Sequence, residues 1–406
     1  MRAAISRRRF LAGTGFFATT LLLEGAISSV RRVVRATEGN RLSPERLVRA
    51  DLPERSSQPV MEPTYRAHLR TKIGSMLLLG FNGTAVDGAS AVVQAIREGF
   101  LGGVIIFDTD AGGRVRNVAS PAQLRTLTAD LQAAAPAGPI IVAVDQEGGH
   151  VARLSGRGFP GTYTAATLGS IGDPAFTQAQ GAAVGQTLAA AGVNLNLAPV
   201  VDVNLNPHND AIGGQGRSFS HSPDAVVRHA AAFASGLRAS GVAATLKHFP
   251  GQGSAGGDTH LGAVDVTDSW SHAELRPFAE LIGAGVADAV MTGHIFNRSL
   301  DTQHPATLSR STIDGLLRRE IGYDGVVISD DLTMGAIQAN YRLEDAVVLA
   351  VEAGVDVLTF GHATAIADME RVVATLVGSV QSGRIPEERI DASYERIRAL
   401  RSRLLH

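Results

Sequence analysis

Short runs of almost uninterrupted apolar residues recur along the chain from about residue 65 onward. Runs of this kind, without polar alternation, are typical of strands buried on both faces, as in parallel sheets. Stretches with helical periodicity, such as residues 121–135 and 343–354, lie between them. The eight runs with the length and the Val and Ile content of strands are residues 76–80, 103–107, 140–145, 193–199, 243–249, 288–294, 325–330 and 356–360.

The alternation of eight strands with helices predicts an α/β protein with a (β/α)8 fold, the TIM-type barrel. A doubly wound open sheet is the alternative, but no predicted strand is followed by the GxGxxG turn of dinucleotide-binding folds. We therefore expect residues 64–406 to form one barrel, a single catalytic domain.

The first 36 residues have the pattern of an export signal. Paired arginines in residues 6–11 (SRRRFL) precede an apolar stretch interrupted by Glu24, which resembles a twin-arginine signal. The apolar stretch is shorter than the roughly 20 residues that span a bilayer; an uncleaved anchor is the alternative. Residues 37–63 are polar and predict an N-terminal extension. We expect a bacterial protein exported to the periplasm or beyond, which meets the membrane only during export.

Composition narrows the class of protein. Hydrophobic residues make up 45% of the chain and charged residues 19%, which allows a sizeable core and excludes wholesale disorder. The net charge of −2, without a long basic run, argues against nucleic acid as a partner. The sequence has no cysteine, which excludes disulfides, thiolate metal sites and a cysteine nucleophile.

Polar residues suited to catalysis end five of the predicted strands or follow them directly. In a (β/α)8 barrel the catalytic groups lie at the C-terminal ends of the strands, so these side chains are expected to meet at one rim. A single polar residue at a strand end is usually a cap or turn former, but here five strands converge. The residues are Asp145, Asp202, the pair Lys247 and His248, His294 and Asp330, of which Asp202 and His294 could equally brace the rim.

Asp330 would be presented from the end of an apolar strand into the barrel mouth. Cationic neighbours at the rim, namely Lys247, Arg153 and Arg217, would lower its pKa and keep it ionised. An ionised, positioned carboxylate is what a glycosidase nucleophile requires. Because strand side chains alternate, only one of Asp330 and Asp331 is expected to face the centre. Asp331 would then cap or brace the next helix.

The glycine-rich loop after the fifth strand is expected to be mobile and carries a candidate acid/base pair. Asp258 lies two residues from His260, and a carboxylate so placed can orient an imidazole for general acid/base catalysis. An ordinary loop with an Asx turn is one alternative. A zinc site formed with His248 and His294 is another, although HExxH and HxH spacings are missing.

The loop after the third strand, VDQEGGHVARL, contains Asp145 and Arg153. An acceptor-only carboxylate beside an arginine suits the binding of sugar hydroxyls. An internal ion pair between these two residues is the alternative.

Together these motifs resemble glycoside hydrolase family 3, in particular its single-domain β-N-acetylglucosaminidase (β-N-acetylhexosaminidase) branch. The resemblance implies a (β/α)8 barrel and hydrolysis with retention through a covalent glycosyl-enzyme, with no metal or organic cofactor. The matching stretches extend from Met76 to about Gly361 and follow the family's order: AVDQEGGHVARL, LAPVVDVNLNPHNDAIGGQGRSFS, KHFPGQGSAGGDTHL, AVMTGHIFN, PATLS and GVVISDDLTMGAI.

The resemblance also implies roles for individual residues. Asp330 is the nucleophile, and the Asp258-Thr259-His260 triplet is similar to the branch's D-S-H signature, so that His260 is the acid/base and Asp258 its partner. Residues that would hold the N-acetylglucosamine ring are Asp145, Arg153, Arg217, Lys247 and His248.

The sequence departs from the family pattern at several positions. Gln252 replaces the second histidine of KHFPGHG, and His150 stands where arginine is common. Residues 212–217 are two longer than usual, which makes Arg217 the least direct of the correspondences. Because the chain ends soon after the eighth unit, a second, sandwich domain is not expected.

The sequence therefore predicts an exo-β-N-acetylglucosaminidase that releases terminal N-acetylglucosamine from small glycans. One Trp and 5% aromatic residues argue against a long polysaccharide platform. Export favours murein fragments as substrate, with chitin oligosaccharides as the alternative, and we expect a monomer. A β-N-acetylglucosaminide phosphorylase remains open because a neutral histidine does not repel phosphate. A non-catalytic secreted sugar-binding barrel and a metal-dependent hydrolase are further alternatives.

Overall fold

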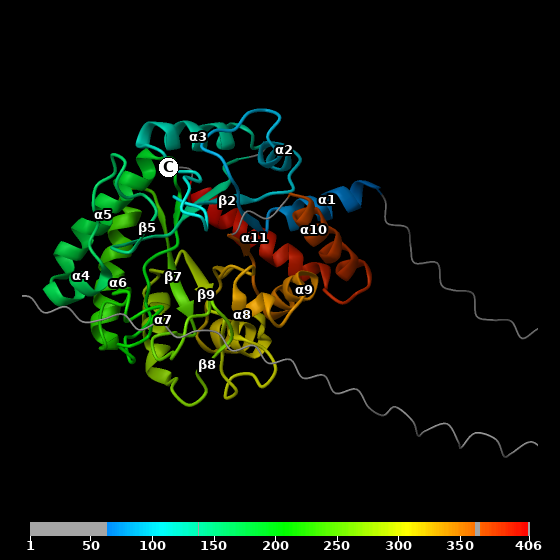
Figure 1. Cartoon of the computed structure of the whole chain (residues 1–406). Helices are drawn as coiled ribbons and strands as arrows, with labels where there is room; N and C mark the ends of the chain where they lie inside the picture. The colour runs from blue at the N-terminus through cyan, green and yellow to red at the C-terminus, as the bar shows by residue number, and fades with distance from the viewer. Residues whose placement is uncertain (1–62, 137, 362–365, 405–406) are drawn as a thin grey trace, which may run out of the picture. The chain divides into compact units, whose positions relative to one another are not determined.

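Eight parallel strands form one sheet in the computed structural model, which describes residues 63–136, 138–361 and 366–404 (Figure 1). Their order is β11-β9-β7-β6-β3-β2-β1-β12, and Ile328 of β11 also bridges Val357 beside β12, so the two edges of the sheet meet. The strands are β1 Leu77–Gly80, β2 Gly103–Ile106, β3 Ile141–Val144, β6 Leu195–Asn196, β7 Ala243–Phe249, β9 Ala289–Thr292, β11 Val326–Ser329 and β12 Leu358–Phe360. Each lies within one predicted run, and the predicted barrel is confirmed.

The strands are buried along their whole length, as their apolar sequences require. β6 is only two residues long, shorter than the predicted run 193–199, because asparagine side chains replace part of its backbone pairing. The amide of Asn194 accepts a hydrogen bond from Val142 N–H (2.8 Å), and that of Asn196 accepts one from Gln146 N–H (3.0 Å).

Helices follow the strands and surround the sheet (Figure 1). The predicted helix at 121–135 begins with Ser120, whose side chain accepts from Gln123 N–H in a capping box, and with Pro121 in the first turn. The helical segments are α1 Pro63–Gly74, α2 Ala91–Arg97, α3 Pro121–Ala133, α4 Ala165–Ile171, α5 Pro174–Ala190, α6 Pro223–Arg238, η1 His272–Glu274, α7 Arg276–Gly283, η2 Ala306–Leu308, η3 Ser311–Glu320 (π-helical), α8 Gly335–Gln338, α9 Leu343–Ala353, α10 Ile366–Gln381 and α11 Glu387–Arg403.

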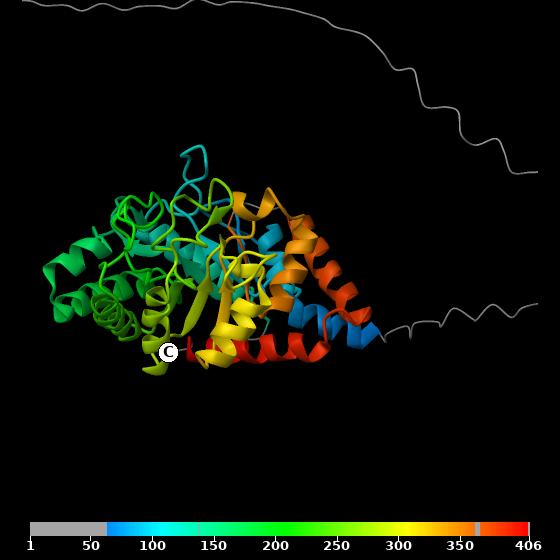
Figure 2. The same ribbon diagram turned by 90° about the horizontal axis from the view of Figure 1, so that it is seen from below.

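The two ends of the barrel differ. At the N-terminal end of the strands lies α11 (Figure 2), whose Arg389 and Arg401 donate to the carbonyl oxygens of Val355 and Pro139, just before β12 and β3. Longer connections occupy the C-terminal end. They contain the antiparallel pair β4 Gln146–Gly148 and β5 Val151–Ala152 and the parallel pair β8 Val264–Asp265 and β10 Ile295–Phe296. A (β/α)8 enzyme places its chemistry at this second end.

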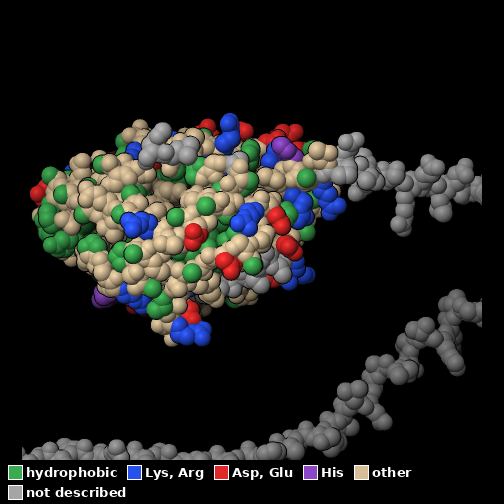
Figure 3. All heavy atoms as spheres, turned by 90° about the horizontal axis from the view of Figure 1, so that it is seen from above, with side chains coloured by type: hydrophobic (Ala, Val, Ile, Leu, Met, Phe, Trp, Pro, Cys, Tyr) green, Lys and Arg blue, Asp and Glu red, His purple; other side chains and the backbone are tan. Residues whose placement is uncertain are grey.

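The surface and the ends of the chain say little about which class of protein this is. In the face shown in Figure 3, basic and acidic side chains are interspersed. Among the described helices, none is long and apolar enough to cross a membrane. The predicted export segment 1–36 and residues 37–62 of the extension lie outside the described residues, and Pro63 is the first residue of α1.

Candidate active site

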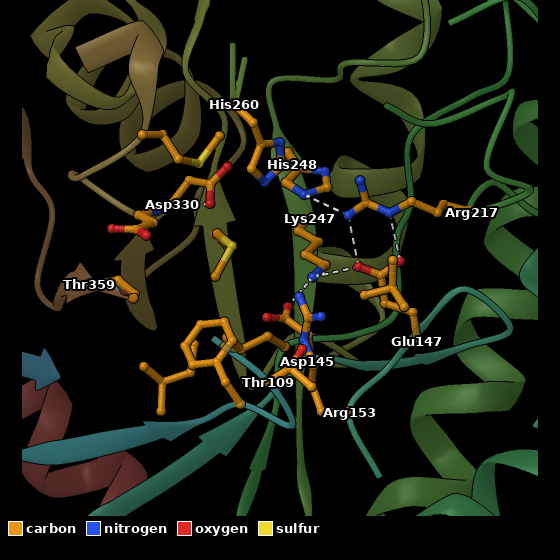
Figure 4. Close-up of a pocket in the computed structure, with 18 of the residues that line it drawn as sticks. Thr109, Asp145, Glu147, Arg153, Arg217, Lys247, His248, His260, Asp330 and Thr359 are labelled. Carbon is orange, nitrogen blue, oxygen red and sulfur yellow. Dashed lines mark hydrogen bonds and ion pairs between the residues drawn. The ribbon is translucent and has the colours of Figure 1, made fainter. Parts of the chain in front are cut away.

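A pocket of about 360 Å³ opens at the C-terminal ends of the strands (Figure 4). Its volume lies at the lower end of the range for small-molecule sites, about 300–1,000 Å³. Asp258, one of the eight residues predicted from the sequence, reaches the pocket through its contact with His260. The other seven line the pocket directly: Asp145, Arg153, Arg217, Lys247, His248, His260 and Asp330.

A network of four charged side chains, of which Glu147 and Lys247 are buried and Asp145 and Arg217 partly buried, forms one wall of the pocket. The Lys247 ammonium lies 2.6 Å from Asp145 Oδ1 and 2.7 Å from Glu147 Oε1. Arg217 donates from Nε and Nη2 to the two oxygens of Glu147, both at 2.8 Å. Burial alone would raise the pKa of each carboxyl group, but the charge of Lys247 lowers the pKa of Asp145 and the charges of Arg217 and Lys247 lower that of Glu147. Both carboxylates therefore stay ionised and can only accept hydrogen bonds from a ligand.

Lys247 and His248 both face the pocket although they are consecutive in β7, where regular alternation would send them to opposite sides. The pairing of β7 with β9 shifts register between Leu246 and Phe249, and such an irregularity re-aims a side chain. Asp202 fixes the result: its Oδ2 lies 2.7 Å from His248 Nδ1, and its Oδ1 accepts from His248 N–H at 3.1 Å. Asp202 is fully buried and braces the rim.

His294 has a similar supporting role. Its Nδ1 lies 2.8 Å from Thr307 Oγ1 and its Nε2 lies 2.9 Å from the carbonyl oxygen of Asp331. It holds the chain that follows β11, next to Asp330.

The Asp330 carboxylate is held by backbone at the end of β11. The backbone N–H of Asp330 donates to Thr292 O (3.2 Å), and the side-chain Oδ1 of Asp330 accepts from Asp331 N–H (2.8 Å). Asp331 also lines the pocket, so the expectation that only one of the pair would face it is wrong. Alternation does not apply because β11 ends at Ser329, before both residues. Asp331 Oδ1 also accepts from Thr333 N–H and Oγ1, so it braces the following turn as expected.

The Asp258 and His260 side chains form a pair, of which His260 lines the pocket. His260 Nδ1 lies 2.7 Å from Asp258 Oδ1, and the same oxygen accepts from His260 N–H at 2.9 Å. Burial would raise the pKa of Asp258, but these two hydrogen bonds and the charges of His260 and Arg217 lower it overall. Because Nδ1 is engaged by Asp258, Nε2 is the ring nitrogen available to a ligand. Figure 4 shows His260 and Asp330 at the same end of the pocket.

The alternative of an internal ion pair between Asp145 and Arg153 is wrong, because Arg153 contacts other groups. Its Nη1 lies 3.7 Å from Asp108 Oδ1, and its guanidinium group lies 5.4 Å from the centre of the Phe107 ring. Asp145, paired with Lys247, and Arg153, beside Asp108, therefore line the pocket independently of each other.

Glu147 and Arg116 are among the pocket residues that sequence reasoning missed. Glu147 lies two residues after Asp145, and a period of two, which places both on one side of an extended chain, could have indicated it. Arg116 comes from the connection after β2, stacks 4.5 Å from the Phe107 ring and donates to Phe81 O at 2.8 Å. No spacing or motif marks Arg116, because its place depends on how that connection folds back over the sheet.

The zinc alternative finds no matching cluster. Within residues 63–136, 138–361 and 366–404, no group of three or more His, Asp or Glu side chains is arranged to hold a metal ion. His248 and His294, two of the three histidines considered, instead have the hydrogen-bond partners described above.

Comparisons with known proteins give a consistent result. The family model described as the N-terminal domain of glycosyl hydrolase family 3 matches residues 68–400. β-Hexosaminidase A of Pseudoalteromonas piscicida is 34% identical over 75% of this chain and 54% of its own length, and a β-hexosaminidase of Xylella fastidiosa is 36% identical over 76% and 92%. This chain thus spans about half of the Pseudoalteromonas protein.

A solved structure is also similar. The glycoside hydrolase family 3 β-N-acetylglucosaminidase from Paenibacillus matches with a TM-score of 0.76 and 39% identity, over 83% of this chain and 62% of that one. The family model covers most of the chain, including all eight strands of the barrel. The segment before residue 68 lies outside the match. On these grounds, this chain belongs to glycosyl hydrolase family 3.

Proposed function

We propose that this protein is a retaining exo-β-N-acetylglucosaminidase, with Asp330 as nucleophile and His260 as acid/base. The observation that carries the proposal is that an Asp258-bound imidazole and the backbone-fixed Asp330 carboxylate open onto one pocket. The two relatives named above are β-hexosaminidases, and the Paenibacillus protein is a β-N-acetylglucosaminidase, which supports this choice of sugar.

In the first step an oxygen of Asp330 attacks the anomeric carbon while the bond to the leaving group breaks. The protonated His260 donates its Nε2 proton to the departing glycosidic oxygen, and Asp258 stabilises the imidazolium through Nδ1. The products are a glycosyl ester on Asp330 and the free alcohol. His260 is left neutral.

In the second step the neutral His260 takes a proton from a water molecule, whose oxygen attacks the anomeric carbon. The ester bond to Asp330 breaks, the carboxylate is regenerated and His260 is protonated again. Two displacements at one carbon give net retention.

The wall formed by Asp145, Glu147, Lys247 and Arg217 would bind the terminal sugar. Its ionised carboxylates accept from hydroxyl groups and its cations donate to them, in positions already fixed by the network. Because the side chains of this wall are largely shielded from solvent, its hydrogen bonds are expected to contribute strongly to sugar specificity.

We further propose that the protein is exported by the twin-arginine route and acts as a monomer on murein fragments outside the cytoplasm. The motif at residues 6–11 supports export. Replacing Arg7 and Arg8 by lysine should retain the protein inside the cell, as measured by fractionation. Equal export of this variant and the parent would exclude the twin-arginine route.

The activity is tested with the nitrophenyl glycosides of N-acetyl-β-glucosamine and of β-glucose, each with and without phosphate. We expect release from the first only, without an effect of phosphate. Stimulation by phosphate, with the sugar 1-phosphate as product, would indicate the phosphorylase. Asp330→Asn should lower kcat by at least about 10³-fold with unchanged thermal unfolding; near-normal turnover would exclude Asp330 as the nucleophile.

A further inference from the structure

A buried carboxylate lies beneath the root of the loop that carries Asp258 and His260. Glu274, at the end of η1, is 0% exposed. Its Oε2 accepts from Gly253 N–H (2.7 Å) and Ser254 N–H (3.3 Å), and its Oε1 accepts from Ser254 Oγ at 2.5 Å. Three donors of the loop root therefore converge on one carboxylate.

Glu274 has no cationic partner in the part of the chain that the structure describes, where no Lys, Arg or His nitrogen lies within 4.0 Å of its oxygens. Burial without such a partner is costly for a carboxylate. Burial raises the pKa of Glu274 to about 7, and the charge of Asp202 adds to this, while the bonds from Ser254 and Gly253 act in the opposite direction. The interactions that the carboxylate makes in this place are its hydrogen bonds to Gly253 and Ser254 of the loop.

The contact between Glu274 and the loop root is close. Gly251 has a φ of +115°, and a Cβ atom there would lie 2.4 Å from Glu274 Cβ. A Cβ atom at Gly253 would lie 1.7 Å from the carbonyl oxygen of Val203. Two of the four glycines expected to make the loop mobile are thus needed for packing at its root.

The root is connected to the acid/base pair through Gln252. Its backbone N–H donates to Asp202 Oδ1 at 2.8 Å, and its side-chain Nε2 donates to Thr259 Oγ1 at 3.3 Å. Thr259 is 1% exposed and lies between Asp258 and His260 in the sequence. A shift of the loop root would therefore be expected to move the His260 imidazole relative to the pocket.

We propose that Glu274 is a positioning residue that, by holding Gly253 and Ser254, places His260 where it can protonate the glycosidic oxygen. The inference rests on the proposed function of His260 as acid/base. It adds a residue that touches neither the sugar nor the pocket.

The test uses two substrates that share the same sugar and differ in leaving group. A nitrophenolate leaves without a proton, whereas the second sugar of a β-1,4-linked N-acetylglucosamine disaccharide needs one. Because kcat/KM reports the first step, misplacement of the acid should affect only the disaccharide. For Glu274→Gln we expect kcat/KM to fall by about tenfold or more with the disaccharide and by less than about threefold with the aryl glycoside.

Three variants make the test specific. Glu274→Asp keeps the charge and should recover part of the loss. Ser254→Ala removes one donor from the loop side and should change the same ratio, which keeps the test open if Glu274→Gln does not fold. Asp288→Asn is the matched control, because Asp288 is a buried carboxylate at the opposite end of the barrel, held by Arg238 and Ala244 N–H; its substrate ratio should stay unchanged.

The sole tryptophan of the sequence offers a second readout, since Trp270 Nε1 donates to Pro250 O at the loop root (3.2 Å). Its emission should shift in Glu274→Gln and not in Asp288→Asn. An equal loss on both substrates, or no loss on either, would overturn the proposal. A parent protein that releases neither product would instead refute the proposed function and, with it, the role of Glu274 in that reaction.

Discussion

Glu147 and Lys247 form an ion pair of 2.7 Å between side chains that are only 3% and 2% exposed. Such a pair is costly to break, because removing the Glu147 charge leaves the buried Lys247 with Asp145 as its remaining carboxylate partner. Both oxygens of Glu147 also accept hydrogen bonds from Arg217, which makes Glu147 the centre of the proposed sugar-binding wall.

Glu147→Gln should weaken both the fold and the binding of the sugar. Loss of one partner of a buried pair costs about 3–5 kcal/mol; Arg217 would lose its carboxylate partner, and Lys247 would lose one of its two. We expect a lower free energy of unfolding in urea and a higher KM for the nitrophenyl N-acetylglucosaminide. Lys72→Ala serves as the control, since its contacts with Asp391 and Glu387 are partly exposed and remote from the pocket; an equal KM effect there would contradict the assignment.

Glu147 also predicts the acid side of the stability profile. Its pKa is lowered in the folded protein from an ordinary value of 4.5, so the folded state releases this proton more readily than the unfolded chain. The stabilisation is fully present above about pH 4.5 and is lost as the pH falls toward the lower folded-state pKa. Unfolding free energies measured from pH 6 to pH 3 should fall steeply in the parent and less steeply in Glu147→Gln; parallel curves would exclude Glu147 as a main contributor.

Asp258→Asn should impair catalysis without unfolding the protein. The amide can hold the ring of His260, but it cannot stabilise the imidazolium as a carboxylate does. We expect kcat/KM for the disaccharide to fall by about 10²-fold or more, within the range of general acid/base contributions, and that for the aryl glycoside to fall less. Thermal unfolding serves as the control, and an unchanged disaccharide rate would exclude the dyad.

The barrel and most of the pocket were predictable because their determinants are local. A strand buried on both faces has to be apolar throughout, so a charged residue such as Asp330 or Lys247 at its end is conspicuous. A barrel then brings such ends together whatever the intervening loops do. Asp258 and His260 were located in a different way, by their two-residue spacing in the loop after the fifth strand, and they are neighbours in the sequence as well as in space.

The remaining features depend on tertiary contacts that no local pattern encodes. The exposure of both Asp330 and Asp331 to the pocket follows from the place where β11 ends. The pairing of Lys247 with Glu147 joins residues 100 positions apart, and Glu274 contacts Ser254 across 20 positions. In these last two pairs the side chains are polar and buried, and each partner is identified only by the fold.

Glu274 should produce a pH dependence of stability opposite in sign to that of Glu147. Its pKa rises from 4.5 to about 7 on folding, so between these values the folded state binds a proton that the unfolded chain has lost. Stability is therefore expected to fall as the pH rises from about 4.5 to 7, in total by about 3 kcal/mol, and to be level above that range.

Glu274→Gln removes this titration. The free energy of unfolding of the variant, relative to that of the parent, should therefore increase by up to about 3 kcal/mol between pH 5 and pH 8. Urea unfolding at both values measures the change, with Asp288→Asn as the control for loss of a buried carboxylate. A variant that gains relative stability at pH 8 while losing activity on the disaccharide would show that the ionised carboxylate serves catalysis at the expense of stability. A constant difference at the two pH values would mean that Glu274 has the same protonation state in both and that its burial carries no such cost.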